Sequence, residues 1–179
     1  MNICIFGSAN DDIDEDFLNQ GYILGKTLAN QGYNIVFGGG RDGMMGAVAK
    51  GAFENNGKVY GIAPSWISKF DDPFENCEEY IYTDGMDDRK ELFFKKSDVF
   101  IITPGGIGTL DEFFDVVTLK YLQRHEKPII IFNINNFYDD LIHMLNKMFE
   151  NNFISSREIK LYEVGNTIDD ILDLIENKS

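Results

Sequence analysis

Short apolar runs alternate along this chain with segments in which hydrophobic residues recur every three or four positions. The apolar runs predict strands at 2–6, 33–37, 59–63, 79–82, 99–102 and 129–132, with a shorter one near 161–164. In the segments between these strands, hydrophobic residues repeat at the spacing of an amphipathic helix. The repeats are Phe17, Leu24 and Leu28; Leu110, Phe113, Val117 and Tyr121; and Phe137, Leu141, Met144 and Met148.

The predicted strands are apolar on both faces, as in the run from Ile129 to Phe132. This pattern is expected of a parallel sheet that is covered by helices on each side. The sequence therefore predicts a single Rossmann-like α/β domain over residues 1–179, with a doubly wound, mostly parallel sheet of six to seven strands. Because ligands bind beyond the carboxyl ends of the strands in such sheets, functional residues are expected in the segments that follow the strands.

Composition narrows the classes of function. Hydrophobic residues make up 44% of the 179 residues, which is typical of a globular chain with a core of its own. The formal net charge is −14, and nucleic-acid binding requires a basic surface, so no nucleic-acid partner is expected. No apolar run approaches the roughly 18 residues of a membrane span, and a strand begins at Asn2 without a signal peptide. Two cysteines, Cys4 and Cys77, make no disulfide framework, so we expect a soluble cytoplasmic protein with Cys4 buried in a strand.

The most informative stretch is 104–112, which reads Pro-Gly-Gly-Ile-Gly-Thr-Leu-Asp-Glu and follows a predicted strand. A glycine turn that leads into a helix leaves unpaired N–H groups at the positive end of the helix dipole, which makes an anion site. Glu112 lies close behind it, so the segment indicates chemistry on a phosphorylated substrate. A structural interpretation is also open, because residues 109–112 spell a capping box. In that case Glu112, at the third helical position, bonds only to the backbone of Thr109.

Two further segments place polar side chains near strand ends. Gly7-Ser8 follows the first strand, and Ser8 offers a hydroxyl to a phosphate or a ribose, although such turns are common in structural roles. Residues 86–90 read Met-Asp-Asp-Arg-Lys and open a predicted helix. Arg89 and Lys90 are adjacent cations in a very acidic chain, so they either neutralise a phosphate or lie on a solvated helix surface.

Residues 38–46 are rich in glycine and follow the second predicted strand. Glycines such as Gly39 and Gly40 allow the backbone to approach a ligand or a neighbouring strand. The stretch contains a G-x-G-x-x-G spelling, which by itself is a weak signal. Because it follows the second strand and lacks an acidic ribose ligand at the usual distance, NAD binding is not expected.

Weaker candidates have ordinary explanations. His125 lies in a polar connection between a helix and a strand, where we expect it to be solvated. Residues 64–78 form the longest irregular stretch and are a candidate lid or site wall. Within it, Trp66, Phe70 and Phe74 either stack on a base or pack under the loop.

Taken together, these segments resemble the Lonely guy family of cytokinin riboside 5′-monophosphate phosphoribohydrolases, which are often mislabelled as lysine decarboxylases. The family motifs P-G-G-x-G-T-x-x-E and M-x-x-R-K match residues 104–112 and 86–90, and G-G-G-x-x-G-x-M-G matches residues 38–46. The resemblance continues to Lys127-Pro128 and to residues 152–154, and so spans nearly the whole chain.

The resemblance implies hydrolysis of the N-glycosidic bond of a nucleoside 5′-monophosphate, AMP or an N6-substituted AMP, to free base and ribose 5-phosphate. It implies that Arg89 and Glu112 are catalytic. Cleavage develops positive charge on the ribose, and a carboxylate such as Glu112 stabilises that charge and orients the attacking water. Arg89 then holds the substrate against Glu112. This chemistry needs no cofactor and no metal, and the family is implied to be homodimeric, with its active sites near the interface.

Substrate-binding positions follow from the same resemblance. They are Ser8, Gly39, Gly40, Lys90, Gly105, Gly106, Gly108, Thr109, Asp111 and Thr118. Two departures leave the base open: residues 10–12 replace a family glycine, and residues 118–122 lack the family's Trp and Gln. The alternative is a non-catalytic nucleotide- or molybdenum-cofactor-binding module. Such a module has no need of an arginine–glutamate pair, which favours the enzyme.

Overall fold

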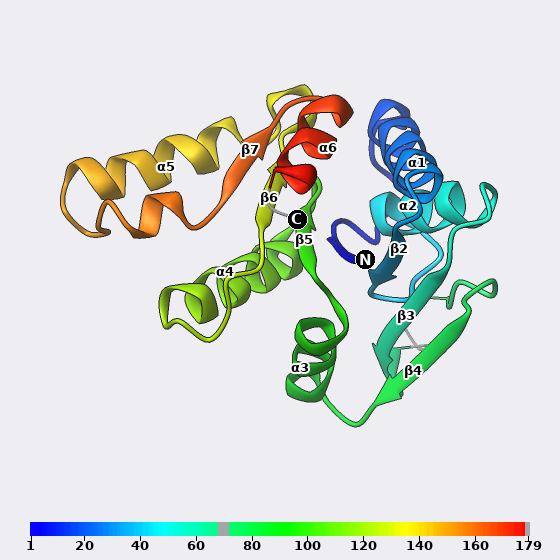
Figure 1. Cartoon of the computed structure of the whole chain (residues 1–179). Helices are drawn as coiled ribbons and strands as arrows, with labels where there is room; N and C mark the ends of the chain where they lie inside the picture. The colour runs from blue at the N-terminus through cyan, green and yellow to red at the C-terminus, as the bar shows by residue number, and fades with distance from the viewer. Residues whose placement is uncertain (68–71, 178–179) are drawn as a thin grey trace.

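The computed structural model describes residues 1–67 and 72–177. Within these residues, seven strands form one sheet in which every neighbouring pair is parallel, in the order β4-β3-β2-β1-β5-β6-β7 (Figure 1). The strands are β1 (Asn2–Phe6), β2 (Asn34–Phe37), β3 (Val59–Pro64), β4 (Glu79–Thr83), β5 (Val99–Ile102), β6 (Ile129–Phe132) and β7 (Glu163–Gly165). The chain builds outward from β1 through β2 to β4, then crosses over and builds the other half from β5 to β7. The predicted doubly wound α/β sheet is confirmed.

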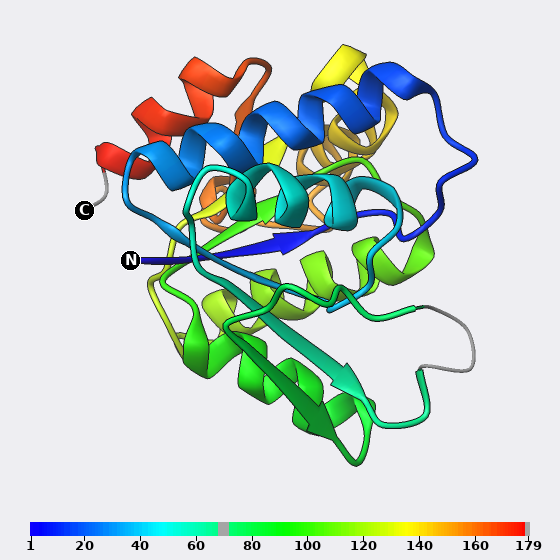
Figure 2. The ribbon, with the colours of Figure 1, turned by 90° about the vertical axis from the view of Figure 1, so that its right-hand side faces the viewer.

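Helices cover both faces of this sheet (Figures 1 and 2). Helices α1, α2 and α6 pack on one face, and α3, α4 and α5 pack on the other. The helices are α1 (Glu15–Asn30), α2 (Gly43–Phe53), α3 (Met86–Lys96), α4 (Ile107–Tyr121), α5 (Asp139–Glu150) and α6 (Ile168–Glu176). No helix in the described part of the chain is long and apolar enough to cross a membrane.

The side chains of β1 show why the sheet is buried on both sides. Ile3 and Ile5 belong to the apolar cluster under α1, α2 and α6, whereas Cys4 and Phe6 belong to the cluster under α3, α4 and α5. All four are at most 2% exposed. Successive residues of a strand point to opposite faces, so only a run that is apolar throughout satisfies two helical layers. The expectation that Cys4 is a buried strand residue is confirmed.

Helix α2 was not apparent from the hydrophobic spacing, because it begins at Gly43 inside the glycine-rich stretch and is buried on most sides. Its glycines allow α1 and α2 to approach closely. A Cβ at Gly25 of α1 would lie 2.0 Å from the Val48 carbonyl oxygen, and one at Gly51 would lie 2.0 Å from the Tyr22 carbonyl oxygen. These two glycines therefore serve helix packing.

Residues 72–74 are bound to the glycine-rich stretch 38–46. The Arg41 N–H donates to the Asp72 carbonyl oxygen at 2.9 Å, and the Phe74 N–H donates to the Gly39 carbonyl oxygen at 2.8 Å. Phe74 is 9% exposed and its ring packs edge-on against Phe37. Phe74 therefore packs under the loop, which was one of the two expectations for it, and is not placed to stack on a base. Phe70 lies outside the described residues.

His125 corrects the expectation of a solvated side chain. It is 8% exposed, its Nε2 lies 2.9 Å from the Val116 carbonyl oxygen, and its Nδ1 accepts a hydrogen bond from the Lys127 N–H. Burial lowers the pKa of its imidazole. The polar neighbours in the sequence suggested exposure, but the ring packs against Phe94 and Phe100 beneath α4.

Candidate functional site

The site lies where the strand order reverses, at the carboxyl ends of β1 and β5. These strands are parallel neighbours, with Phe6 in register with Ile102, so the segments that follow them leave the sheet side by side. The Ser8 N–H donates to the Pro104 carbonyl oxygen at 3.0 Å, and the Thr103 hydroxyl donates to the Phe6 carbonyl oxygen at 2.9 Å. A crevice at this reversal point is the usual ligand site of doubly wound folds.

The glycine turn opens α4 without a side-chain cap. Gly106 is the N-cap residue and no side chain bonds to the first-turn N–H groups. A Cβ at Gly105 would lie 2.1 Å from the Thr109 Oγ1, whereas nothing lies within 4 Å of a Cβ at Gly106 or Gly108. The turn is therefore tight on its inner side and open on the side of the N–H groups, as an anion site requires.

The capping-box interpretation of residues 109–112 is wrong. The helix begins at Ile107, so Thr109 is its third residue and Glu112 its sixth. Glu112 is thus beyond the reach of the N-cap backbone, and its Oε1 accepts a hydrogen bond from Arg89 instead. The sequence misled because Thr-x-x-Glu forms a capping box only where that Thr is the N-cap residue, and here the glycine turn sets the N-cap three residues earlier, at Gly106.

Arg89 and Glu112 form the centre of the site. Arg89 Nη1 lies 2.9 Å from Glu112 Oε1, and the two side chains are 12% and 7% exposed. Arg89 lies in the first turns of α3 and Glu112 in the second turn of α4, so the pair joins two helices that lie on the same face of the sheet. A buried charged pair of this kind costs desolvation energy and is weak support for stability, which points to a chemical role.

Two further contacts hold the Arg89 guanidinium. Its Nε donates to the Ile62 carbonyl oxygen at 3.2 Å, and its Cζ lies 4.7 Å from the centre of the Phe93 ring. A Cβ at Gly38 would lie 2.7 Å from Arg89 Nη2, so the missing side chain of Gly38 makes room for the guanidinium. Gly38 is therefore part of the site's construction, although sequence reasoning singled out Gly39 and Gly40.

Burial sets the electrostatics of Glu112. Desolvation raises the pKa of its carboxyl, and the charge and hydrogen bond of Arg89 oppose that rise. The net result is a pKa for the Glu112 carboxyl that is raised above the ordinary value of a glutamate. A buried carboxylate that is paired with an arginine and lies near an uncapped helix N-terminus is suited to act on a developing positive charge.

A cavity of about 550 Å³ opens over this centre. Six residues predicted from the sequence line it: Ser8, Arg89, Gly106, Gly108, Thr109 and Glu112. The lining also includes Gly7, Ala9, Asn10 and Met45, which were not among the predicted site residues. Asn10 was noticed only as a departure from the family glycine, and Met45 belongs to the 38–46 motif. We call this space the strand-end cavity.

Six other predicted residues lie outside the lining of the strand-end cavity. Gly39 and Gly40 are buried, and Gly39 is packed against Tyr80. Gly105 borders a smaller apolar cavity on the other side of the turn. Thr118 is exposed on α4. Their parts in substrate binding stay predictions.

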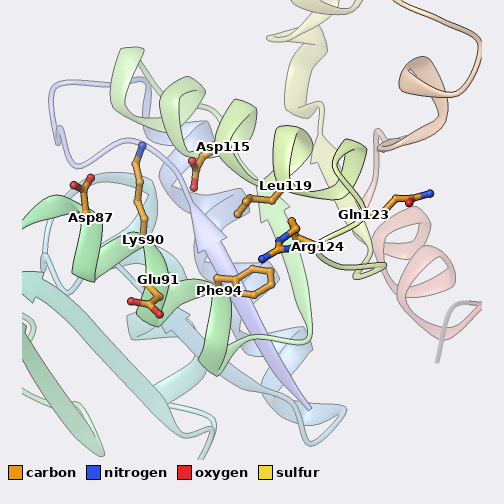
Figure 3. Close-up of a pocket in the computed structure, with 8 residues that line it drawn as sticks. All are labelled: Asp87, Lys90, Glu91, Phe94, Asp115, Leu119, Gln123 and Arg124. Atoms are coloured by element: carbon orange, nitrogen blue, oxygen red, sulfur yellow. The ribbon is translucent and has the colours of Figure 1, made fainter.

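The remaining two, Lys90 and Asp111, pair with each other at 2.8 Å between Lys90 Nζ and Asp111 Oδ2. Lys90 lines a second cavity of about 500 Å³ between α3 and α4 (Figure 3). We call this space the interhelical cavity. Its other lining residues are Asp87, Glu91, Phe94, Asp115, Leu119, Gln123 and Arg124. Two residues that are adjacent in the chain, Arg89 and Lys90, therefore line different cavities.

The fold and site define a Rossmann-like α/β protein with an open helix N-terminus beside a buried arginine–glutamate pair. Residues 45–175 match the family described as possible lysine decarboxylase, and the chain belongs to this family. It is 35% identical over 149 residues to a cytokinin riboside 5′-monophosphate phosphoribohydrolase of Mycobacterium tuberculosis, covering 83% of this chain and 80% of the relative. It is 33% identical over 159 residues to an enzyme of the same name from Arabidopsis thaliana, covering 88% of this chain and 74% of the relative.

Solved structures confirm the fold. A molybdenum cofactor binding protein from Rippkaea orientalis superposes with a TM-score of 0.76 over 99% of this chain and 96% of its own, at 23% sequence identity. At that identity the likeness concerns the arrangement of helices and strands.

Proposed function

We propose that this protein hydrolyses the N-glycosidic bond of a nucleoside 5′-monophosphate, AMP or an N6-substituted AMP, to the free base and ribose 5-phosphate. The observation that carries the proposal is the buried Arg89–Glu112 pair, which lines the same cavity as the open N-terminus of α4. Relatives that share most of the chain are named for this reaction.

The chemistry follows from the two ends of the strand-end cavity. The N–H groups at Gly106 and Gly108 and the hydroxyl of Thr109 receive the 5′-phosphate. Glu112, one turn further along α4, faces the ribose, where its carboxylate stabilises the oxocarbenium-like charge and orients the water that attacks C1′. Arg89 anchors the ribose or phosphate and holds Glu112 in place through its 2.9 Å contact.

The phosphate assignment is tested with AMP and adenosine. If the α4 N-terminus binds the phosphate, its binding energy orients the reacting bond, and loss of the phosphate lowers turnover as well as affinity. Release of adenine from both substrates, followed by chromatography, gives kcat and KM for each. Equal kcat/KM on AMP and adenosine would remove the phosphate from the proposal. A panel of N6-substituted nucleotides in the same assay then identifies the preferred base.

Glu112→Gln tests the catalytic carboxylate. Gln keeps a hydrogen-bond acceptor for Arg89 but removes the negative charge, so we expect a folded protein that binds AMP and releases adenine roughly 10²–10⁴ times more slowly. Melting temperature, AMP binding and base release are measured on the same preparation. Glu91→Gln, on the exposed side of α3, is the matched control. A Glu112→Gln protein with the normal release rate would overturn the assignment.

We also propose that the protein acts as a homodimer whose interface includes the outer face of α4. Ile107, Phe114 and Tyr121 recur every seven residues there and are 89%, 41% and 43% exposed, with Leu122 beside them 57% exposed. Thr118 lies within this stripe, which fits a position near a shared site. Phe113, next to Phe114 on the same helix, does not add to this surface, because its ring is buried against the sheet.

Light scattering tests the dimer. A mass near the 20.4 kDa of one chain at micromolar concentration would contradict it. Phe114→Asp is expected to produce monomers, and Ile23→Asp, an equally exposed apolar position on α1, is the control that leaves the mass unchanged.

The alternative is a carrier or sensor without turnover, as suggested by the name of the structural neighbour that binds molybdenum cofactor. Tight AMP binding with no adenine release from wild-type protein would favour it. Decarboxylation, which the family description names, is not supported by the residues, because the described residues that line the strand-end cavity include no lysine to form an imine.

A further inference from the structure

Two ion pairs cross between α3 and α4 in adjacent register. Arg89 pairs with Glu112 at 2.9 Å and Lys90 pairs with Asp111 at 2.8 Å. The order is reversed between the two helices, because the residue after Arg89 on α3 pairs with the residue before Glu112 on α4. The first pair is buried, whereas the Lys90 and Asp111 side chains are 23% and 57% exposed, so the second pair forms the outer layer of the same contact.

The outer pair is turned away from the strand-end cavity. Neither Lys90 nor Asp111 lines it, and the Lys90 side chain extends from α3 toward α4, with its Nζ on the side of Asp115 (Figure 3). Its Nζ is engaged by Asp111. The arrangement gives Lys90 no path to a phosphate at Gly106 or Gly108 without breaking that pair.

We propose that Lys90 and Asp111 are positioning residues, which form an outer ion pair that holds α3 against α4 and keeps the charge around Glu112 in balance. The proposal rests on the proposed function, because Glu112 must act as a carboxylate for its charge to matter. It replaces the expectation that Lys90 and Asp111 contact the substrate. Asp111 adjoins Glu112 in sequence and Lys90 adjoins its partner Arg89, so the outer charges act on Glu112 through space.

The titratable and charged groups that face Glu112 come from three elements. Arg89 and Lys90 on α3 lower the pKa of its carboxyl, Asp111 on α4 raises it, and burial raises it most. The Cys4 thiol on β1 also faces it, but burial raises the pKa of that thiol well above its ordinary value, so it stays neutral. Lys90 and Asp111 therefore act on Glu112 with opposite signs, and each compensates the other.

The test compares wild type, Lys90→Met, Asp111→Asn and the double variant, with kcat/KM for adenine release from AMP measured across pH. In Lys90→Met the unpaired Asp111 raises the pKa of Glu112, so the acidic limb moves to higher pH. On that limb kcat/KM falls about two- to fivefold, the scale of a partly exposed pair. In Asp111→Asn the limb moves to lower pH, and in the double variant it returns to the wild-type position. The shifts shrink as ionic strength rises.

Direct substrate contact by Lys90 makes a different prediction. Lys90→Met would then lower kcat/KM for AMP at every pH without moving the limb, and Asp111→Asn would restore nothing. That result, or single variants that leave the limb in place, overturns the proposal. Lys95→Met, which removes the same charge from an exposed position on α3, is the control and is expected to leave the limb unmoved. Melting temperatures establish that each variant is folded.

Glu112→Gln separates this proposal from the proposed function. If Glu112→Gln releases adenine normally, the proposed function fails. If it is inactive and the four pH profiles coincide, the function stands and the outer pair has no positioning role. The exchanged variant Lys90→Asp with Asp111→Lys restores a pair of opposite polarity, and we expect it to return the acidic limb toward the wild-type position from which either single change moves it.

Discussion

The strand-end cavity is lined by Arg89 and the interhelical cavity by the next residue, Lys90. The two cavities differ in the kind of residues that line them. The first is lined by glycines, small residues and two buried charged side chains. The second is lined by long, mostly charged side chains that reach into solvent. Backbone donors and a dry ion pair make strong, fixed electrostatic contacts, whereas exposed charges are screened and mobile. The two cavities are similar in volume, so volume does not distinguish them. Chemistry is expected in the strand-end cavity, because its charged side chains are buried and held in place by the fold.

Apart from the change at Glu112, the largest effect is expected from Arg89→Lys. A lysine keeps the charge, but its single ammonium cannot contact Glu112 and the Ile62 carbonyl oxygen while lying over Phe93. We expect base release to fall about 10²-fold, the scale of a reacting group misplaced by about 1 Å. Steady-state kinetics with AMP measures it. Arg124→Lys in the interhelical cavity is the control. Equal losses of base release in both variants would contradict the claim that only the strand-end cavity carries the chemistry.

A smaller loss is expected from Gly38→Ala. The added Cβ would lie 2.7 Å from Arg89 Nη2 and 3.2 Å from Met45 Sδ, so the guanidinium has to move. We expect a loss of kcat/KM of about tenfold and a loss of stability of about 1–3 kcal/mol from overpacking. Gly85→Ala, where nothing lies within 4 Å of the new Cβ, is the matched control. Unchanged kinetics in Gly38→Ala would show that Arg89 tolerates displacement.

Tyr138→Phe probes a buried hydrogen bond to the backbone just before the glycine turn, at a still smaller scale. The Tyr138 hydroxyl donates to the Thr103 carbonyl oxygen at 2.7 Å in a buried position, and burial raises its pKa well above the ordinary value. The hydroxyl is therefore protonated at any working pH. Its removal is expected to cost about 1 kcal/mol of unfolding free energy. Chemical denaturation measures the loss, and a stability equal to wild type would mean that the turn needs no support from below.

The smallest effect is expected from Glu91→Gln in the interhelical cavity. Glu91 is paired with Lys95 on the same helix, and both side chains are about 60% exposed. Such a pair contributes between zero and about 0.5 kcal/mol, so stability and base release stay near wild type. Thermal melting and AMP turnover provide the check. A tenfold loss of turnover would mean that the interhelical cavity takes part in the chemistry as well as the strand-end cavity.

The sequence by itself determined the layered α/β fold, because runs such as Ile129–Phe132 are buried on both faces only in a parallel sheet. It also determined the open helix N-terminus after β5, since a glycine turn before a helix leaves the same N–H groups free whatever surrounds it. Local patterns suffice for such features. They failed for α2, which is buried on most sides and carries no amphipathic spacing, and for His125, whose polar neighbours suggested solvent.

Only the tertiary structure decided the roles of neighbouring residues. From the family resemblance, Arg89 and Glu112 were expected to be catalytic, and their neighbours Lys90 and Asp111 to bind the substrate. The packing of α3 against α4 buries the Arg89–Glu112 pair and leaves Lys90–Asp111 at the surface. It also places Gly38, distant in sequence, against the guanidinium. Burial and pairing depend on which helix faces cross, and no local pattern in either segment contains that information.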